Sequence, residues 1–301
     1  MRTAYLGTSE FAATVLRRLA ASPHRPALVV APPDRRQGRG RRMQPPPAAV
    51  AAAELGLELL QAEDVNGEGA LERIRAVRPE AVLVCAFGQL IREPLLSELP
   101  LLNLHPSLLP RWRGAAPIER AMMAGDERTG VCVMQLTAGL DSGPVALCEE
   151  VAIDPDEDFA ALSARLAALG GDLLVRALDL QAEGALEFSE QSEDGATYAE
   201  KIDAAERRLD PARPAPELAA KVRALTPHVG AYLEAAGGER LGVRRAHVVE
   251  AELPRGAVEA RDGTLLLGCA EGALQLDLIQ PPGGRAMPAE AYLRGHRPPQ
   301  L

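Results

Sequence analysis

The sequence contains no apolar run long enough to cross a membrane. Its apolar stretches stop well short of the roughly 18 consecutive residues that spanning a bilayer requires. The amino-terminal segment, MRTAYLGTSEF, predicts a strand and a turn and lacks the apolar core of a signal peptide. Both features predict a cytoplasmic protein.

Cysteine is scarce, with Cys85, Cys132, Cys148 and Cys269 scattered along the chain. No pair shows CxxC spacing or a metal-site spacing with histidine, so the sequence predicts neither a disulfide framework nor a zinc site. We expect these cysteines to be small buried apolar residues, and we expect no bound metal.

A glycine-rich dinucleotide motif is also missing. Gly7 follows the first predicted strand, but the GTSEF segment there does not contain GxGxxG. This absence argues against an NAD-dependent enzyme.

What is present suits a large α/β domain. The chain has 301 residues, 47% of them apolar, which is enough to fill more than one core. Buried-looking strands are predicted at 3–7, 27–31 and 81–87, with helices at 9–21 and 47–56 between them. This alternation predicts a doubly wound, Rossmann-like parallel sheet.

The character of the sequence changes after about residue 185. A long amphipathic helix (159–184) ends the first domain, and a polar stretch follows it. One further helix (214–225) then precedes short strands separated by GG, DG and EG turns at roughly ten-residue spacing, which predicts a small β-barrel. The predicted boundaries are 1–187 for the catalytic domain, 188–209 for a linker and 210–301 for the C-terminal domain.

Two short segments, NLHP and LDSG, contain an amide, an imidazole and a carboxylate that suit acyl transfer to an amine. This reaction passes through a tetrahedral intermediate, so the site needs an oxyanion donor and a group that accepts a proton. Asn103 can donate its NH2 group, and His105 can accept a proton with Asp141 as its partner. Any one of these residues alone would more often be a turn or capping residue.

Their positions relative to predicted strands strengthen the interpretation. In an extended segment, Asn103 and His105 lie two residues apart and therefore point to the same face. The strand 131–136 leads into the turn that carries Asp141. We expect three strand ends to bring these groups to one edge of the sheet, where open parallel sheets bind ligands.

The net charge of the chain is −9, but five arginines are concentrated within eight residues. They are Arg35, Arg36, Arg39, Arg41 and Arg42. Prolines flank this run on both sides, so it is either a solvated loop or an arm that binds phosphate.

These segments resemble the 10-formyltetrahydrofolate-dependent formyltransferases, and within them the methionyl-tRNA formyltransferases. SLLP and D-x-G are typical of the wider group, whereas RWRGAAPI and TYAEKI narrow the resemblance to the tRNA enzymes. YLGTSEFAATVL (5–16) and PPDRRQGRGRR (32–42) are in register with them. The resemblance extends over most of the chain.

The resemblance implies a formyl donor, an acceptor and a role for each segment. It implies 10-formyltetrahydrofolate as cosubstrate, charged initiator methionyl-tRNA as acceptor, no membrane partner and a monomer. It implies that Asn103, His105 and Asp141 are catalytic, that the five arginines reach the acceptor stem, and that the C-terminal domain is an OB-like barrel that binds tRNA. The folate-binding residues that it implies are Phe87, Gly88, Gln89, Leu90, Ile91, Ser107, Leu108, Leu109, Pro110 and Leu140.

The chain departs from the family at one place and leaves two alternatives open. His228 and Val229 stand where many members carry Trp-Pro, which makes local packing there less certain. One alternative is a formyltransferase for a small amine, such as glycinamide ribonucleotide or an amino sugar nucleotide, which would not need the arginine run. The other is a non-catalytic RNA-binding module, against which the intact Asn103, His105 and Asp141 argue.

Overall fold

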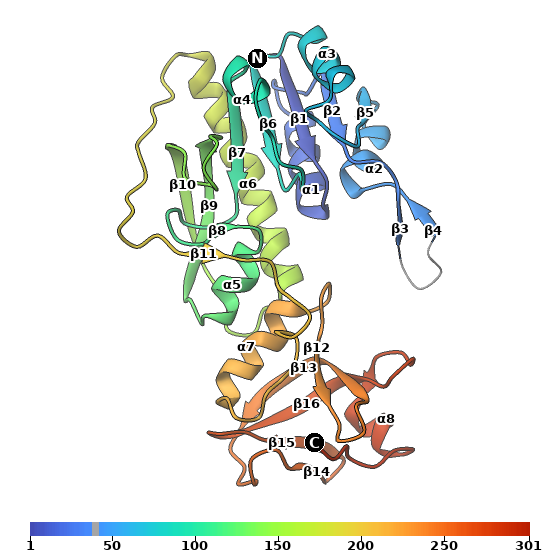
Figure 1. Cartoon of the computed structure of the whole chain (residues 1–301). Helices are drawn as coiled ribbons and strands as arrows, with labels where there is room; N and C mark the ends of the chain where they lie inside the picture. Colours follow the sequence, from blue (N-terminus) through green and yellow to red (C-terminus); the bar gives the residue numbers. More distant parts are fainter. Residues whose placement is uncertain (38–41) are drawn as a thin grey trace. The chain divides into compact units, whose positions relative to one another are not determined.

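The computed structural model describes residues 1–37 and 42–301 and divides into two compact units (Figure 1). Unit 1 comprises residues 1–114, 129–151 and 163–198, and unit 2 comprises 115–128, 152–162 and 199–301. Two segments that precede residue 163 in sequence therefore belong to unit 2 together with residues 199–301. The boundaries at residues 187 and 210 remain a prediction.

Unit 1 is built on a seven-stranded sheet with the order β10-β9-β7-β6-β1-β2-β5. Its strands are β1 (Thr3–Gly7), β2 (Leu28–Ala31), β5 (Leu59–Gln61), β6 (Ala81–Cys85), β7 (Leu101–His105), β9 (Arg128–Gln135) and β10 (Val145–Ala152). Strands β1, β6 and β7 are buried along their whole length, as continuous apolar runs in a parallel sheet predict.

The predicted α/β class is confirmed, but the sheet is mixed rather than wholly parallel. The five strands from β7 to β5 run parallel to their neighbours. Strand β9 pairs antiparallel with β7, with His105 opposite Cys132 and Leu102 opposite Gln135. The apolar pattern of residues 131–136 predicted the strand, but strand direction is a long-range property that the pattern does not contain.

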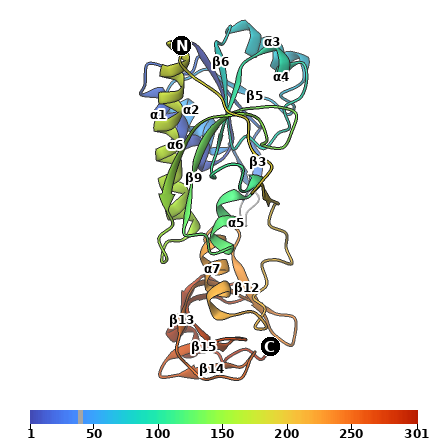
Figure 2. The ribbon, with the colours of Figure 1, turned by 90° about the vertical axis from the view of Figure 1, so that its left-hand side faces the viewer.

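Helices cover both faces of this sheet (Figure 2). Unit 1 contains the helices α1 (Glu10–Ala20), α2 (Pro47–Glu54), α3 (Glu68–Ala76), α4 (Leu95–Glu98) and most of α6 (Phe159–Ala182). Helix α1 begins where the Ser9 side chain accepts from the Ala12 N–H, with Glu10 in its first turn and two arginines in its last. Helices α1 and α6 lie on one face, and α3 and α4 lie on the other.

The arginine-rich segment begins and ends in a short β-hairpin. Strand β3 (Arg35–Gln37) pairs antiparallel with β4 (Arg42–Gln44), with Arg36 opposite Met43. We call these two strands the arginine hairpin. Arg39 and Arg41 lie outside the described residues.

Unit 2 contains an antiparallel sheet of six strands, which confirms that the C-terminal domain is built on β-strands. The strands are β12 (Ala231–Glu234), β13 (Arg240–Val249), β14 (Val258–Arg261), β15 (Thr264–Gly268), β16 (Ala273–Gln280) and β17 (Met287–Pro288). Helices α5 (Pro117–Met123), α7 (Ala215–Leu225) and α8 (Ala289–Leu293) belong to the same unit. Leu218 and Val222 of α7 pack in its core with Leu265 and Leu276 of the sheet.

The expectation that all four cysteines are buried apolar residues is wrong for two of them. Cys132 on β9 and Cys148 on β10 form a disulfide, and Cys148 is exposed. The two strands are neighbours in the sheet, so residues 16 positions apart in sequence lie 4.1 Å apart at their Cα atoms. Cys85 and Cys269 are buried thiols, as predicted. Within the described parts of the chain, no helix is long and apolar enough to span a membrane.

Candidate active site

Strand β7 supplies the amide and the imidazole of the site. Asn103 and His105 are 8% and 3% exposed and point to the same face, as their spacing predicts. Leu104 between them points to the opposite face, where it packs on Gly170 of α6. Asn103 lies in the middle of the strand, opposite Met134 of β9 and beside Val84 of β6.

The carboxylate of Asp141 joins the two β7 side chains. Its Oδ1 accepts a hydrogen bond from Nδ2 of Asn103 at 3.3 Å, and its Oδ2 lies 3.6 Å from Nδ1 of His105. The backbone N–H of Gly114 donates to Oδ2 at 2.9 Å. We refer to Asn103, His105 and Asp141 as the Asn–His–Asp cluster. One of the two Nδ2 hydrogens of Asn103 is left for another acceptor.

The surroundings of His105 assign a role to each ring nitrogen. Its Nε2 lies 2.8 Å from the backbone carbonyl of Trp112, which can only accept a hydrogen bond. Nε2 therefore has the proton in the neutral ring, and Nδ1 is the free acceptor. Because Nδ1 faces the Asp141 carboxylate, a proton taken up there would be stabilised by an opposite charge at 3.6 Å.

The route by which Asp141 reaches the cluster differs from the prediction. Strand β9 is antiparallel to β7, so it ends beside Leu101 and Leu102, at the beginning of β7 rather than beside His105. The expectation of three strand ends at one edge is therefore wrong. Asp141 is delivered by the turn between β9 and β10, in a left-handed backbone conformation with φ of 44°. Such a conformation is unfavourable for a non-glycine residue and persists only where the surrounding structure holds it.

The SLLP segment directly follows β7. Ser107 is fully buried, and its hydroxyl donates to the Arg111 carbonyl at 2.6 Å, so this hydroxyl is already satisfied within the chain. Leu108, Leu109 and Pro110 are half-buried. A folate contact by these four residues remains a prediction.

The segment 87–91 follows β6, the neighbour of β7. Phe87 and Ile91 belong to the apolar core, whereas Leu90 is 68% exposed. Gln89 accepts from the Val65 N–H and donates to the Ala62 carbonyl, both at 2.9 Å, which fixes the segment on the rest of unit 1. Leu140, which like residues 87–91 is predicted to contact the folate, is 62% exposed.

A small cavity of about 150 Å³ lies at the switch point of the sheet, where the chain passes from one side of β1 to the other. Thr8 follows β1 and Phe87 follows β6, and the Thr8 hydroxyl donates to the Phe87 carbonyl. Four prolines and Arg35 complete most of the lining. The cavity thus joins part of the predicted folate segment to the base of the arginine hairpin.

The arginines of the hairpin that the structure describes are exposed. Among the described residues, no carboxylate lies within ion-pair distance of Arg35, Arg36 or Arg42. Exposed guanidinium groups without a carboxylate partner among the described residues are suited to bind an anionic partner.

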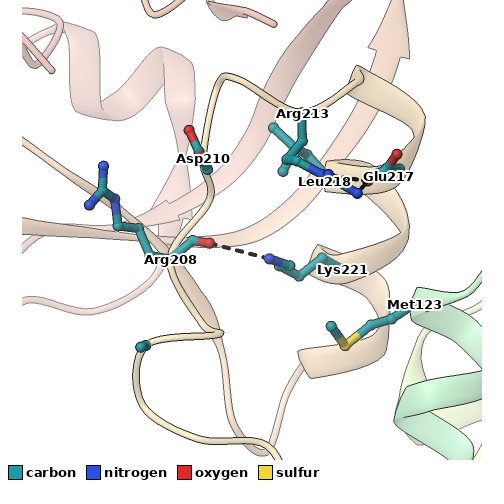
Figure 3. Close-up of a pocket in the computed structure, with 8 residues that line it drawn as sticks. Met123, Arg208, Asp210, Arg213, Glu217, Leu218 and Lys221 are labelled. Carbon is teal, nitrogen blue, oxygen red and sulfur yellow. Dashed lines mark hydrogen bonds and ion pairs between the residues drawn. The ribbon is translucent and has the colours of Figure 1, made fainter. Parts of the chain in front are cut away.

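Unit 2 contains a separate cavity of about 510 Å³ (Figure 3). Lys221 lines it, and its ammonium group donates to the Arg208 carbonyl at 3.4 Å. Burial lowers the pKa of Lys221, although the charge of Glu206 partly offsets this effect. Arg213 in the same cavity is paired with Glu217 at 2.7 Å. None of the predicted site residues lies here.

His228, at the position where the sequence departs from the expected family pattern, is well packed within unit 2. Its ring stacks on Phe159 with centroids 3.8 Å apart, and its Nε2 lies 2.9 Å from Glu119. Val229 packs against the core of the unit. The imidazole therefore makes both a ring contact and a polar contact at this position.

Sequence reasoning missed the groups that hold the cluster in place. Two of them, the Trp112 carbonyl and the Gly114 N–H, are backbone groups and have no side-chain signature. The third is Gln191, whose amide donates to the Asp141 carbonyl at 2.9 Å from 50 residues away in sequence. No group of three or more His, Cys, Asp or Glu side chains that could hold a metal occurs in the described part of the chain.

Family models match both parts of the chain. The model for formyl transferase matches residues 1–178, and the model for the formyl transferase C-terminal domain matches residues 201–297. The class that the fold and these matches define is a two-part formyl transferase.

Curated relatives narrow the class. The methionyl-tRNA formyltransferase of Parvibaculum lavamentivorans is 43% identical over 300 residues, covering 98% of this chain and 97% of the relative. That of Halorhodospira halophila is 42% identical over 306 residues, covering 98% and 96%. The chain belongs to the methionyl-tRNA formyltransferase family.

Solved structures with low sequence identity share the fold. HypX from Aquifex aeolicus in complex with tetrahydrofolic acid has a TM-score of 0.67 at 17% identity, covering 97% of this chain and 47% of that one. Methionyl-tRNA formyltransferase from Clostridium thermocellum has a TM-score of 0.58 at 13% identity, covering 87% and 97%.

Proposed function

We propose that this protein transfers the formyl group of 10-formyltetrahydrofolate to the amino group of initiator methionyl-tRNA. Family membership supports the overall reaction. The convergence of Asn103, His105 and Asp141 within hydrogen-bonding or ion-pair distance of one another is the structural observation on which the assignment rests.

The proposed reaction is a direct transfer. The neutral amine attacks the formyl carbon, and the carbonyl electron pair moves onto oxygen. The free Nδ2 hydrogen of Asn103 donates to this oxyanion. The electron pair on the oxyanion then re-forms the carbonyl bond while the bond to the folate nitrogen breaks. That nitrogen leaves with the electron pair and takes up a proton, which the protonated His105 returns.

Proton transfer is assigned to His105 and Asp141. The amine loses its proton to Nδ1 of His105, directly or through a water held by Asp141, because Nε2 already donates to Trp112. The Asp141 carboxylate stabilises the imidazolium that forms. The residues provide both catalytic functions without a metal or a covalent enzyme intermediate.

The folate is proposed to bind along two segments that follow β6 and β7. Exposed Leu90 and Leu140 are free to cover an aromatic ring system, and residues 107–110 can offer backbone groups to it. Support for a folate ligand also comes from the tetrahydrofolic acid that a fold neighbour binds.

The acceptor tRNA is proposed to meet the arginine hairpin at its acceptor stem and the C-terminal domain (210–301) elsewhere. Support comes from Arg36 and Arg42 of the hairpin, which have no carboxylate partner among the described residues, and from Lys221, which lines the cavity of unit 2. Arg39 and Arg41 are proposed to act with them. The five arginines at positions 35–42 are a concentrated exception on a chain with a net charge of −9.

We further propose a monomer in the cytoplasm, where initiator tRNA is charged, with domains 1–187 and 210–301 joined by residues 188–209. Limited proteolysis tests this division. We expect cleavage between residues 187 and 210. A folate analogue should still bind the amino-terminal fragment, and complete loss of binding would contradict the division.

A direct assay tests the overall reaction. The protein is mixed with 10-formyltetrahydrofolate labelled in its formyl group and with charged initiator tRNA, and the tRNA is analysed for labelled formylmethionine. Parallel reactions contain glycinamide ribonucleotide or an amino sugar nucleotide instead. Labelled formylmethionyl-tRNA is the expected product, and labelling of only a small amine would establish the alternative function.

A further inference from the structure

Arg113 is a fully buried cation next to the Asn–His–Asp cluster. Only 1% of the residue is exposed, although an arginine rarely lies inside a protein without a partner. Its guanidinium donates to Oε1 of Gln191 and to Oε1 of Glu193, both at 3.0 Å, and to the Ser192 carbonyl at 3.4 Å. All of these partners come from three consecutive residues far along the chain.

Both the NH2 group and the oxygen of the Gln191 side chain form hydrogen bonds to neighbouring segments of unit 1. Its NH2 group donates to the backbone carbonyls of Asp141 at 2.9 Å and Gly143 at 2.7 Å. Its oxygen accepts from Nε of Arg113, which can only donate, so the amide orientation is determined by its partners. Gln191 therefore connects the turn that carries Asp141 to the RWRG segment.

Both segments that Gln191 connects, the turn with Asp141 and the RWRG segment, help to form or hold the Asn–His–Asp cluster. Asp141 lies in the turn itself, and residues 112 and 114 on either side of Arg113 bond to His105 and Asp141 through their backbones. The Thr197 hydroxyl accepts from the Trp112 N–H at 2.9 Å and adds a second support from the same segment. All these residues belong to unit 1.

We propose that Gln191 is a positioning residue for the formyl transfer, holding the Asp141 turn so that its carboxylate meets Asn103 and His105. This inference rests on the proposed function. Gln191 need not touch either substrate. The left-handed backbone of Asp141, with φ of 44°, is less favourable than a right-handed one, and the two hydrogen bonds from Gln191 to the turn help to hold it. Small displacements of a catalytic group reduce rates strongly.

The first test compares Gln191→Met with Glu193→Gln. Gln191→Met keeps the side-chain length but removes both donors to the turn, so we expect kcat to fall about tenfold or more with the KM for the folate unchanged within about twofold. Glu193→Gln is the matched control, since it removes the charge of the 77% exposed ion-pair partner of Arg113 but removes no bond to the turn. We expect its kcat to stay within about twofold of wild type.

A double variant separates positioning from a general structural defect. If Gln191 acts through Asp141, Gln191→Met should add almost nothing to the loss caused by Asp141→Ala. A full additional tenfold loss in that background would overturn the proposal. So would a kcat within about threefold of wild type for the single variant.

A second substitution at Gln191 and a wild-type control complete the test. Gln191→Glu retains an acceptor for Arg113 but places an oxygen against two carbonyls, so it tests the same interaction if Gln191→Met does not fold. We expect the same loss of kcat in Gln191→Glu. Wild-type protein is assayed alongside: transfer by wild type and by Gln191→Met at equal rates would overturn only the positioning role, whereas no transfer to methionyl-tRNA by wild type would overturn the proposed function and this inference together.

Discussion

The Asn–His–Asp cluster and the arginine hairpin use their polar groups in opposite ways. In the cluster, Asn103 and His105 are almost fully buried, and each has a partner within the chain. In the hairpin, Arg36 and Arg42 are exposed, and no carboxylate of the described residues pairs with them. Under the proposed function, groups that must be in position before the reaction are held by the protein, and groups proposed to bind a large anion have no partner among the described residues.

The largest effects should come from removing the cluster. Asn103→Ala, His105→Ala and Asp141→Ala should each lower kcat by at least roughly 100-fold, because each removes an oxyanion donor or a proton-transfer group worth about 3 kcal/mol of barrier. Steady-state formylation of charged tRNA measures this. Circular dichroism melting serves as the control for folding.

The contrast between cluster and hairpin would fail if one of the three cluster variants kept a kcat close to that of wild type. A kcat within about threefold for any of the three would show that this residue does not have the role proposed for it. The two others would then have to provide both oxyanion stabilisation and proton transfer.

The hairpin should affect binding rather than chemistry. Replacing Arg36, Arg39, Arg41 and Arg42 by Ala should raise KM for charged tRNA about tenfold or more and flatten its salt dependence. Each phosphate that the protein no longer neutralises removes roughly 0.9 from the log–log slope on duplex nucleic acid. Kinetics at two salt concentrations measure this, and titration with a folate analogue should show unchanged affinity. Equal tRNA kinetics in variant and wild type would mean that the hairpin is only a solvated loop.

Arg120 differs from the hairpin arginines because its guanidinium is paired with a carboxylate of the chain. Its guanidinium donates to Glu206 within unit 2 at 2.5 and 3.0 Å, and this hydrogen bonding is the main reason that the pKa of Glu206 is lowered. Glu206→Gln should lower the free energy of unfolding by about 1–2 kcal/mol at neutral pH and leave kcat unchanged.

The pH dependence of that loss follows from the direction of the shift. A carboxyl whose pKa is lower in the folded state stabilises the fold above its unfolded pKa of about 4.3 and loses this contribution as the pH falls through the folded value. The difference between wild type and Glu206→Gln should therefore shrink below about pH 4. Denaturant unfolding at several pH values measures it, and a difference independent of pH would exclude an ionic origin.

Local patterns predicted many of the elements closely. The predicted strand at 3–7 is β1, and the predicted helix at 214–225 differs from α7 by one residue. Apolar periodicity and capping residues decide such elements within a few turns of chain. The direction of β9 and the pairing of Cys132 with Cys148 depend on which strands become neighbours, and no local pattern contains that information.

The candidate site divides in the same way. The spacing of Asn103 and His105 predicted their common face, because side chains alternate along a strand. The groups that hold these side chains in place could not be predicted. Every residue type has a backbone carbonyl like that of Trp112, and Gln191 lies in a segment whose polar composition predicted a linker. A polar stretch can be solvated or can satisfy buried groups, and composition does not distinguish the two.

A single-turnover experiment with both substrates saturating tests the division between chemistry and binding most directly. It measures the rate of formyl transfer in wild type, in Asn103→Ala and in the fourfold arginine variant. We expect the arginine variant to transfer at the wild-type rate once tRNA is saturating and Asn103→Ala to be slower by at least roughly 100-fold. A slow arginine variant together with a fast Asn103→Ala would contradict the account.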